Sequence, residues 1–173
     1  MHEMKYLSGY PENIRDQVKQ LINQRKLADV LLQKYGAIHN VRTDKALYSY
    51  VTELKNAFIG HAQPVNKVLF DNTLHVIQHA LGTHTSISRV QGGKLKSKHE
   101  IRISSIFKEV PVEFLKMITV HELAHLKEKE HNKAFYQLCL YMEPNYHQLE
   151  FDLRLYLTHI DTFGKLVWAG KSL

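Results

Sequence analysis

Apolar residues recur every three or four positions through much of the chain, which is the spacing of helices that bury one face. The first such stretch runs from Glu12 to Gly36, and the second runs from residue 43 or 44 to Gly60. Both end at a glycine, the residue that commonly follows a helix C-terminus. A third helix is predicted over residues 72–81, with a strand as the alternative.

The period then changes from helical to alternating. Residues 83–90 and 100–104 are short segments in which β-branched or apolar side chains alternate with polar ones. Between them, Gln91–Lys94 contains two adjacent glycines and is typical of a turn. We therefore expect two strands of a small antiparallel sheet.

Helical spacing returns after Pro111, a favourable first helical residue. A long helix is expected there, followed by one from about Asn132 and another from about Asn145 to His159. Helices around a small antiparallel sheet indicate the α+β class. The length fits one domain, 1–173, with an N-terminal helical part (1–62) and a second part (63–173) that contains the sheet and the later helices.

The bulk composition is that of an ordinary globular protein. Hydrophobic residues make up 44% of the 173 positions, and a single cysteine, Cys139, excludes a disulfide-stapled scaffold. The lone thiol and the lack of a secretory signal pattern favour the cytoplasm, and no apolar run approaches the roughly 18–20 residues of a membrane helix. The net charge of +6 is spread along the chain, so it permits weak contact with nucleic acid or nucleotides without indicating it.

The segment Thr119–His125 contains the pattern His-Glu-x-x-His, with His121 and His125 four positions apart. On a helix such residues share one face, so both imidazoles can approach one point. Neutral imidazole nitrogens bind zinc at about 2.0–2.1 Å. Glu122 lies beside that face, where it can act as general base on a metal-bound water rather than as a ligand.

A third ligand is expected from His131, six residues after His125. An unbroken helix would carry it roughly 9 Å along the axis and onto another face, so the helix must end between the two histidines. The intervening residues favour helix and contain no glycine, whereas Asn132 is a good N-cap for the next helix. The alternative third ligand is a glutamate from the later helices, Glu143 or Glu150.

The full motif is His121-Glu122-Leu123-Ala124-His125, five residues, and then His131-Asn132-Lys133-Ala134-Phe135. It resembles the YgjP-like metallopeptidase domain family and its relatives, the SprT and WLM zinc-protease groups. Those families share His-Glu-Leu-x-His, a third histidine after five intervening residues, and an aromatic residue four positions later. The similarity covers roughly residues 65–160.

The resemblance implies a minimal zincin fold in the catalytic part, with one zinc per chain held by His121, His125 and His131 and with Glu122 as the base. The expected reaction is hydrolysis of peptide bonds. The expected partner is then a peptide or protein substrate, which could add to the sheet edge at Glu100–Ser104. The candidates for substrate or oxyanion contacts are Tyr146, His147 and His84.

The substrate side departs from the family, because Ser88–Gly92 stands where the family's first strand has a Trp-Gly-Ser-Cys-like stretch. Two alternatives to a peptidase stay open. The same metal could serve a nucleoside triphosphate pyrophosphohydrolase, with phosphates held by Arg89, Lys94, Lys96 and Arg102. The other alternative is a non-catalytic, zinc-stabilised module that binds nucleic acid.

Overall fold

The computed structural model describes residues 4–74 and 99–168. Along the chain the elements are η1 (Lys5–Leu7), α1 (Glu12–Asn23), α2 (Leu27–Lys34), α3 (Asp44–Ile59), β1 (Val65–Asp71), β2 (His99–Ser104), η2 (Ser105–Glu109), α5 (Val112–Ala124), α6 (Lys133–Met142) and α7 (Tyr146–Phe163). Helices and a two-stranded sheet confirm the α+β class. Within the described ranges, no helix has both the length and the apolar character needed to cross a membrane.

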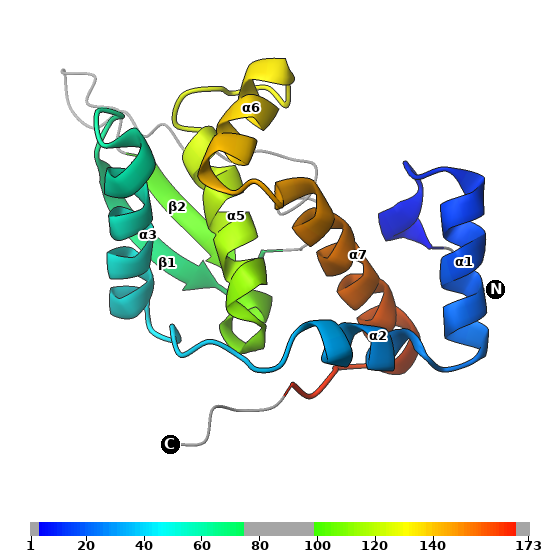
Figure 1. Cartoon of the computed structure of the whole chain (residues 1–173). Helices are drawn as coiled ribbons and strands as arrows, with labels where there is room; N and C mark the ends of the chain where they lie inside the picture. The colour runs from blue at the N-terminus through cyan, green and yellow to red at the C-terminus, as the bar shows by residue number, and fades with distance from the viewer. Residues whose placement is uncertain (1–3, 75–98, 169–173) are drawn as a thin grey trace.

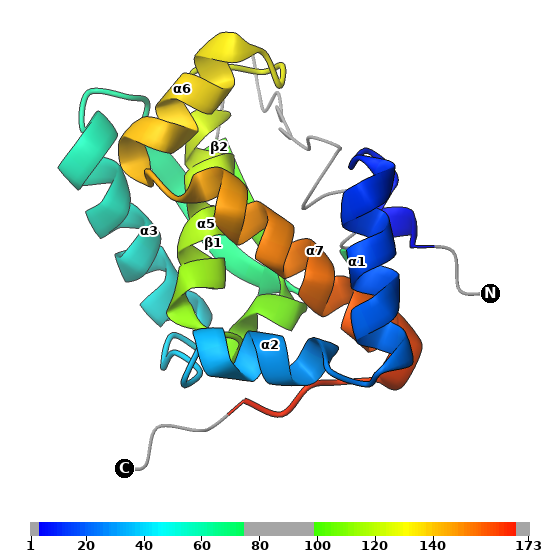
Figure 2. The same ribbon diagram turned by 45° about the vertical axis from the view of Figure 1, so that its right-hand side comes forward.

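Helix α5 lies at the centre of the structure (Figure 1). Most of its side chains from Phe114 to Ala124 are buried, which is the pattern of a helix enclosed on all sides. The sheet and α3 lie on one side of it, and α6 and α7 lie on the other (Figures 1 and 2). Groups near the C-terminal end of α5 are therefore held by an element that is packed on most of its surface.

The two strands pair in parallel, with Val68 opposite Ile101 and Phe70 opposite Ile103. The expected antiparallel arrangement is wrong in this respect. A parallel pair requires a long connection, which residues 72–98 provide. Residues 72–74 have no helical structure, so the helix expected over 72–81 does not start at residue 72. The rest of that helix and the expected strand at 83–90 lie outside the described residues.

The single helical stretch expected before Gly36 is instead two helices, α1 and α2. They separate at Arg25, which has a left-handed φ of 54°. The backbone N–H of Lys26 donates to the carbonyl of Leu21 at 2.8 Å, and that of Arg25 donates to Ile22 at 3.0 Å. This is a Schellman ending, which normally places glycine in the left-handed position. The sequence hid the break because arginine occupies that position.

Helix α3 begins and ends where the sequence analysis expects. The Thr43 hydroxyl accepts a hydrogen bond from the backbone N–H of Ala46 at 3.1 Å, and Gly60 is the C-cap. Asp44 in the first turn accepts a hydrogen bond from the backbone N–H of Phe70 at 2.9 Å. The start of α3 is therefore fixed to β1.

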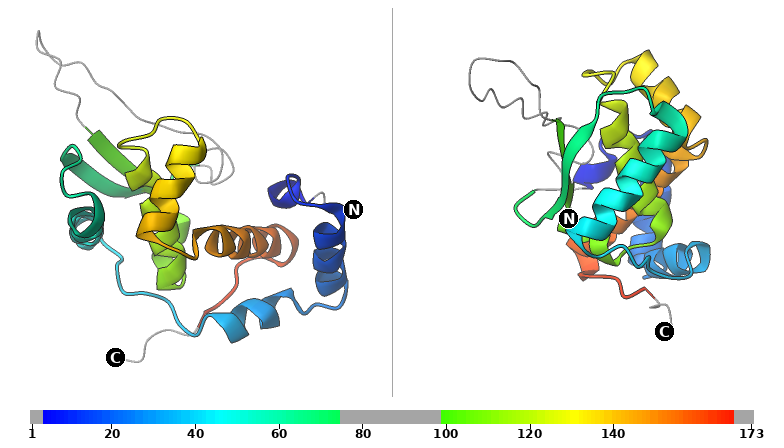
Figure 3. Two further views of the ribbon diagram at one scale, coloured as in Figure 1. Left: turned by 45° about the horizontal axis from the view of Figure 1, so that its top comes forward. Right: turned by 90° about the vertical axis from the view of Figure 1, so that its left-hand side faces the viewer.

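The N-terminal helices are attached to α7, against which α2 packs (Figure 3). Asp152 on α7 is buried, and its carboxylate accepts a hydrogen bond from the Tyr35 hydroxyl and pairs with Lys34 at 2.6 Å. Two residues later, Arg154 donates to the backbone carbonyl of Tyr6 at 2.8 Å. Segments from both ends of the chain are thus joined through buried polar contacts.

The substitution Asp152→Ala is expected to lower the free energy of unfolding by about 2–3 kcal/mol, because it leaves the buried Tyr35 hydroxyl without its acceptor. Urea denaturation followed by circular dichroism measures the change. The wild type and the variant should each unfold in one cooperative transition. Separate transitions for the N-terminal helices and the remainder would contradict a single domain spanning 1–173.

The matched control is Asp16→Ala, because Asp16 pairs with Lys19 at 3.7 Å and both side chains are exposed. Its expected change is about 0.5 kcal/mol or less. Equal effects of the two substitutions would show that Asp152 does not hold the N-terminal helices in place.

Candidate metal centre

The C-terminal end of α5 positions the first two histidines of the motif. His121 lies in the last turn, and His125 is the C-cap residue. Beyond it, the backbone N–H of Leu126 donates to Leu123 at 3.0 Å, a three-residue spacing that tightens the end of the helix. The required break after His125 is therefore confirmed.

His131 immediately precedes α6. Asn132 is the N-cap, and its side-chain oxygen accepts a hydrogen bond from the backbone N–H of Phe135 at 2.9 Å. The cap fixes the direction in which the chain enters α6, which follows α5 in Figure 1. His131 then lies back beside the end of α5, with its Nε2 3.1 Å from that of His125. This arrangement confirms both the predicted cap and the predicted return of His131.

The Nε2 atoms of the three histidines converge. His125 Nε2 lies 3.2 Å from His121 Nε2 and 3.1 Å from His131 Nε2, and the remaining distance between His131 and His121 is 3.3 Å. A tetrahedral ion with ligand bonds of about 2.0–2.1 Å separates its nitrogens by about 3.3–3.4 Å. The group could therefore hold a metal ion with little movement.

Neighbouring groups orient two of the rings for this purpose. Nδ1 of His121 lies 2.8 Å from the Tyr146 hydroxyl, and Nδ1 of His125 lies 2.9 Å from the carbonyl oxygen of Glu128. The carbonyl is an acceptor only, so Nδ1 of His125 carries the proton and the lone pair that a metal would bind lies on Nε2. Tyr146 gives His121 the same tautomer when its hydroxyl accepts, an arrangement typical of metal-ligating histidines.

Phe135 packs against all three imidazoles. Its ring centroid lies 5.0 Å from His121, 4.6 Å from His125 and 4.9 Å from His131, and the side chain is fully buried. His121 and His125 are buried as well, whereas His131 is partly exposed. The three imidazoles are therefore packed against an apolar side chain on one side, and the cluster is open to solvent at His131.

Glu122 lies on α5 between the two helical histidines. Burial raises the pKa of its carboxyl group to about 8. Among the described residues, no hydrogen bond or ion pair holds this carboxylate. A nearby cation would favour the charged form and lower the pKa again. The side chain is thus available to exchange a proton close to the three imidazoles.

The remaining candidates lie in different surroundings. Tyr146 is buried and supports His121, so it is not an exposed donor to substrate. His147 is exposed, with its ring centroid 5.4 Å from that of Tyr136. His84 lies outside the described residues. The alternative ligands are occupied elsewhere, since Glu143 pairs with Lys116 and Glu150 pairs with Arg154.

Tyr136 is a neighbour of the centre that sequence analysis did not single out. Its ring is partly buried, and its centroid lies 6.5 Å from that of His131. The sequence feature that could have indicated this residue is its position near the start of the helix that follows His131. With His147 it forms an aromatic border beside the histidine cluster.

Comparison with known proteins supports the metal site and changes the expected reaction. A family model described as YgjP-like, metallopeptidase domain, matches residues 67–156. Among curated proteins, the chain is similar to the UTP pyrophosphatase of Escherichia coli (strain K12), with 59% identity over 160 residues that cover 92% of this chain and 96% of the relative. No solved structure gives a significant match.

The expectation of peptide-bond cleavage is wrong. A protein this similar over nearly its whole length is named for a nucleotide substrate, which agrees with the alternative kept open above and not with the main expectation. The reason to expect a peptide partner is lost with it. The comparisons do support an enzyme, and the family and the histidine cluster fit a metal-binding hydrolase.

The protein is expected to bind one divalent ion per chain. Elemental analysis after dialysis should find about one equivalent in the wild type and none in His121→Ala or His125→Ala, because two imidazoles do not make a tight site. His131→Ala should also lose the ion. His99→Ala, which removes a histidine outside the cluster, should keep it. Full metal content in His131→Ala would remove that residue from the ligand set.

The substitution Tyr146→Phe is expected to weaken metal affinity by about tenfold or more while preserving the fold. It removes only the hydroxyl that holds His121 Nδ1. Competition with a chromophoric chelator measures the affinity. Tyr136→Phe removes a hydroxyl from a ring that borders the cluster, with its centroid 6.5 Å from that of His131, so it should leave the affinity unchanged. Equal affinities for the two variants would contradict the role given to Tyr146.

Proposed function

The chain belongs to the YgjP-like metallopeptidase domain family, and from this premise we propose that it is a metal-dependent nucleoside triphosphate pyrophosphohydrolase that acts on UTP. The observation that carries the proposal is the 59% identity to the UTP pyrophosphatase of Escherichia coli across 92% of this chain. A match of that extent reaches beyond residues 67–156 and includes N-terminal helices, so it reflects more than a shared metal motif.

We assign zinc as the ion, held by His121, His125 and His131. Three imidazole nitrogens at tetrahedral spacing are a typical ligand set for catalytic zinc, which keeps a further position open. When bound, such an ion polarises a phosphoryl oxygen and lowers the pKa of an adjacent water. The same properties serve a carbonyl or a phosphorus centre, so the metal does not decide which bond is cleaved.

Glu122 is assigned as the general base. It accepts a proton from the attacking water while the water oxygen forms a bond to the α-phosphorus. The bond from that phosphorus to the bridging oxygen breaks, and the proton passes to the departing pyrophosphate. The support for this role is its position between two ligands on a rigid helix and the lack of another described partner for its carboxylate.

The phosphate-binding role expected of Arg102 finds no support. Its guanidinium pairs with Asp71 at 2.7 Å and with Glu100 at 3.2 Å, so its donors are directed at carboxylates on the sheet. The remaining cations of that expectation, Arg89, Lys94 and Lys96, lie outside the described residues. Exposed lysines near the metal centre offer another source of positive charge.

These lysines lie on the segment around His131, and they are Lys127, Lys129 and Lys133. Their ammonium groups can pair with the non-bridging oxygens of a triphosphate. The aromatic border of Tyr136 and His147 offers ring faces to a planar base. Cations and aromatic rings beside one metal site match a nucleotide better than they match an extended peptide.

The metal-loaded protein is expected to convert UTP to UMP and pyrophosphate. A reaction in ¹⁸O-labelled water, followed by ³¹P NMR, should place the label in UMP, because attack occurs at the α-phosphorus. Casein should remain intact under the same conditions. Release of UDP and orthophosphate, or cleavage of casein with UTP untouched, would overturn the proposed reaction.

The variant Glu122→Gln should retain one metal ion and lose at least about a hundredfold in kcat, since general-base catalysis contributes roughly 10²–10⁴-fold. Glu113→Gln makes the same chemical change at an exposed position in the first turn of the same helix, and it should retain full turnover. Normal turnover in Glu122→Gln would end the assignment of that residue.

A further inference from the structure

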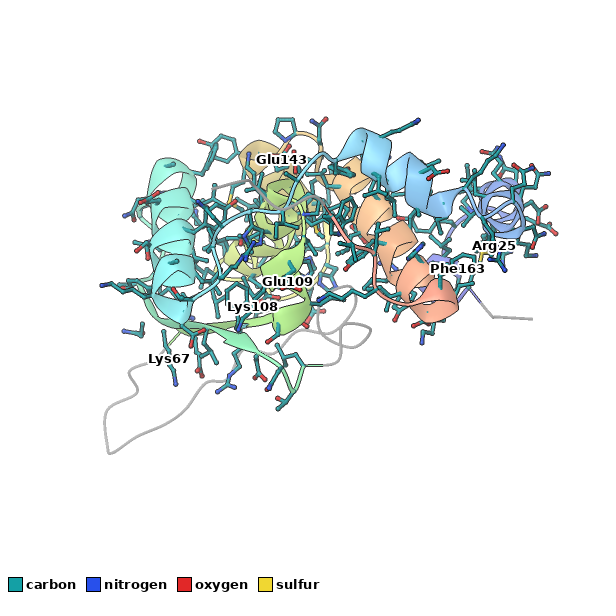
Figure 4. The ribbon with its side chains drawn as sticks, turned by 90° about the horizontal axis from the view of Figure 1, so that it is seen from below. Arg25, Lys67, Lys108, Glu109, Glu143 and Phe163 are labelled. Carbon is teal, nitrogen blue, oxygen red and sulfur yellow. The ribbon has the colours of Figure 1, made fainter. Side chains whose placement is uncertain are left out.

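A cavity of about 400 Å³ lies at the other end of α5 from the histidines. Lys108 and Glu109 line it just before α5 begins, and Tyr156 and Ile160 line it from α7. These α7 residues follow Tyr146 by ten and fourteen positions, which corresponds to roughly 15–21 Å along a helix. Figure 4, seen from below, shows Lys108 and Glu109 side by side at this end. The cavity is therefore separate from the metal centre.

Cations outnumber carboxylates around this cavity. Arg42, Lys108 and Lys165 line it, and Glu109 is the acidic residue among its lining side chains. Glu109 pairs with Lys165, and Lys165 and Arg42 lower the pKa of Glu109. Lys108 lies over the ring of Phe70, 5.3 Å from its centroid, and within the described ranges neither Lys108 nor Arg42 forms a salt bridge with a carboxylate. The cavity thus has positive charge that its own acid does not balance.

The cationic side chains stand on fixed backbone. His39 is buried, with Nε2 against the carbonyl of Phe107 at 2.6 Å, while its Nδ1 accepts from the backbone N–H of Val41 at 2.9 Å. These bonds join the segment before α3 to η2 and place Arg42 beside the cavity. Prior ordering of this kind reduces the entropic cost of binding a ligand.

Lys165 is held in place by the end of α7. Gly164 has a φ of 85°, so the chain turns there, and its carbonyl oxygen lies 3.1 Å from Nδ1 of His159. Leu166 and Trp168 beyond it are buried, which fixes the tail next to the cavity. The cations therefore come from three separate segments of the chain that the fold brings together.

Part of the cavity wall is apolar. Ile106 and Ile160 line it together with the buried ring of Tyr156. A volume of about 400 Å³ falls within the range of roughly 300–1,000 Å³ typical of small-molecule sites. An inorganic anion would contact the cations and gain nothing from this wall, whereas an organic anion would use both.

We propose that this cavity is a second ligand site, separate from the metal centre, that takes an organic phosphate of the size of a nucleoside monophosphate. The phosphate lies between Arg42 and Lys108 within reach of Lys165, and the ring system lies against Ile106 and Ile160. The site rests on this cavity alone and is independent of the bond that the metal centre hydrolyses.

The experiment uses the metal-loaded protein with ¹³C-labelled isoleucine methyl groups. The signals of Ile106 and Ile160 report on the cavity itself, so binding at the histidines cannot be mistaken for it. Titration with UMP should shift both signals to saturation. UMP should bind about tenfold or more tightly than either uridine or inorganic phosphate. Absence of a shift, or equal affinity for phosphate alone, would overturn the proposal.

Two variants with opposite expected effects test the charges. Arg42→Gln combined with Lys108→Gln should weaken UMP binding at this site by about tenfold or more, because it removes two phosphate contacts. Glu109→Gln should tighten binding several-fold, since it frees Lys165 and removes a repelling carboxylate. A matched control, Lys19→Gln on α1, should change nothing. Unchanged UMP affinity in both the double variant and Glu109→Gln would exclude the cavity as the binding site.

Discussion

The metal centre depends on where α5 stops. Had the helix continued through Leu126 and beyond, His131 would lie on another face, and two imidazoles alone would remain. The helix ends with three-residue hydrogen bonds, and the side chain of Asn132 starts the next helix in a new direction. Phe135, in the first turn of α6, then packs on all three histidines. One apolar side chain thus contacts every imidazole that the helix end and the cap bring together.

Features set by local chemistry could be predicted from the sequence. The shared face of His121 and His125, the cap at Asn132 and the start of α3 at Thr43 each depend on neighbours within a few positions. Features set by distant contacts could not. The parallel pairing of the strands depends on where residues 72–98 lead the chain, and the support of His121 by Tyr146 joins positions 25 apart. The break at Arg25 was hidden because a left-handed residue there is not glycine.

The predicted reaction was wrong for a related reason. Three imidazoles and a glutamate define a place where water can be activated, and that chemistry is common to attack on a carbonyl and attack on phosphorus. The choice between them lies in the side chains that bind the rest of the substrate, and those are spread along the chain with no fixed spacing. The expectation for Arg102 shows the difficulty, because its position suggested phosphate binding while the fold commits it to Asp71 and Glu100. Similarity over whole chains contains that information where a short motif does not.

Helix α7 connects the metal centre to the part of the chain that the family model leaves out. Its first residue, Tyr146, holds His121, and six residues later Asp152 anchors Tyr35 and Lys34 of the N-terminal helices. The same helix therefore both orients one of the three histidines and attaches the N-terminal helices. This gives a physical reason why similarity to the curated relative extends through most of the chain, when residues 67–156 already contain all three histidines.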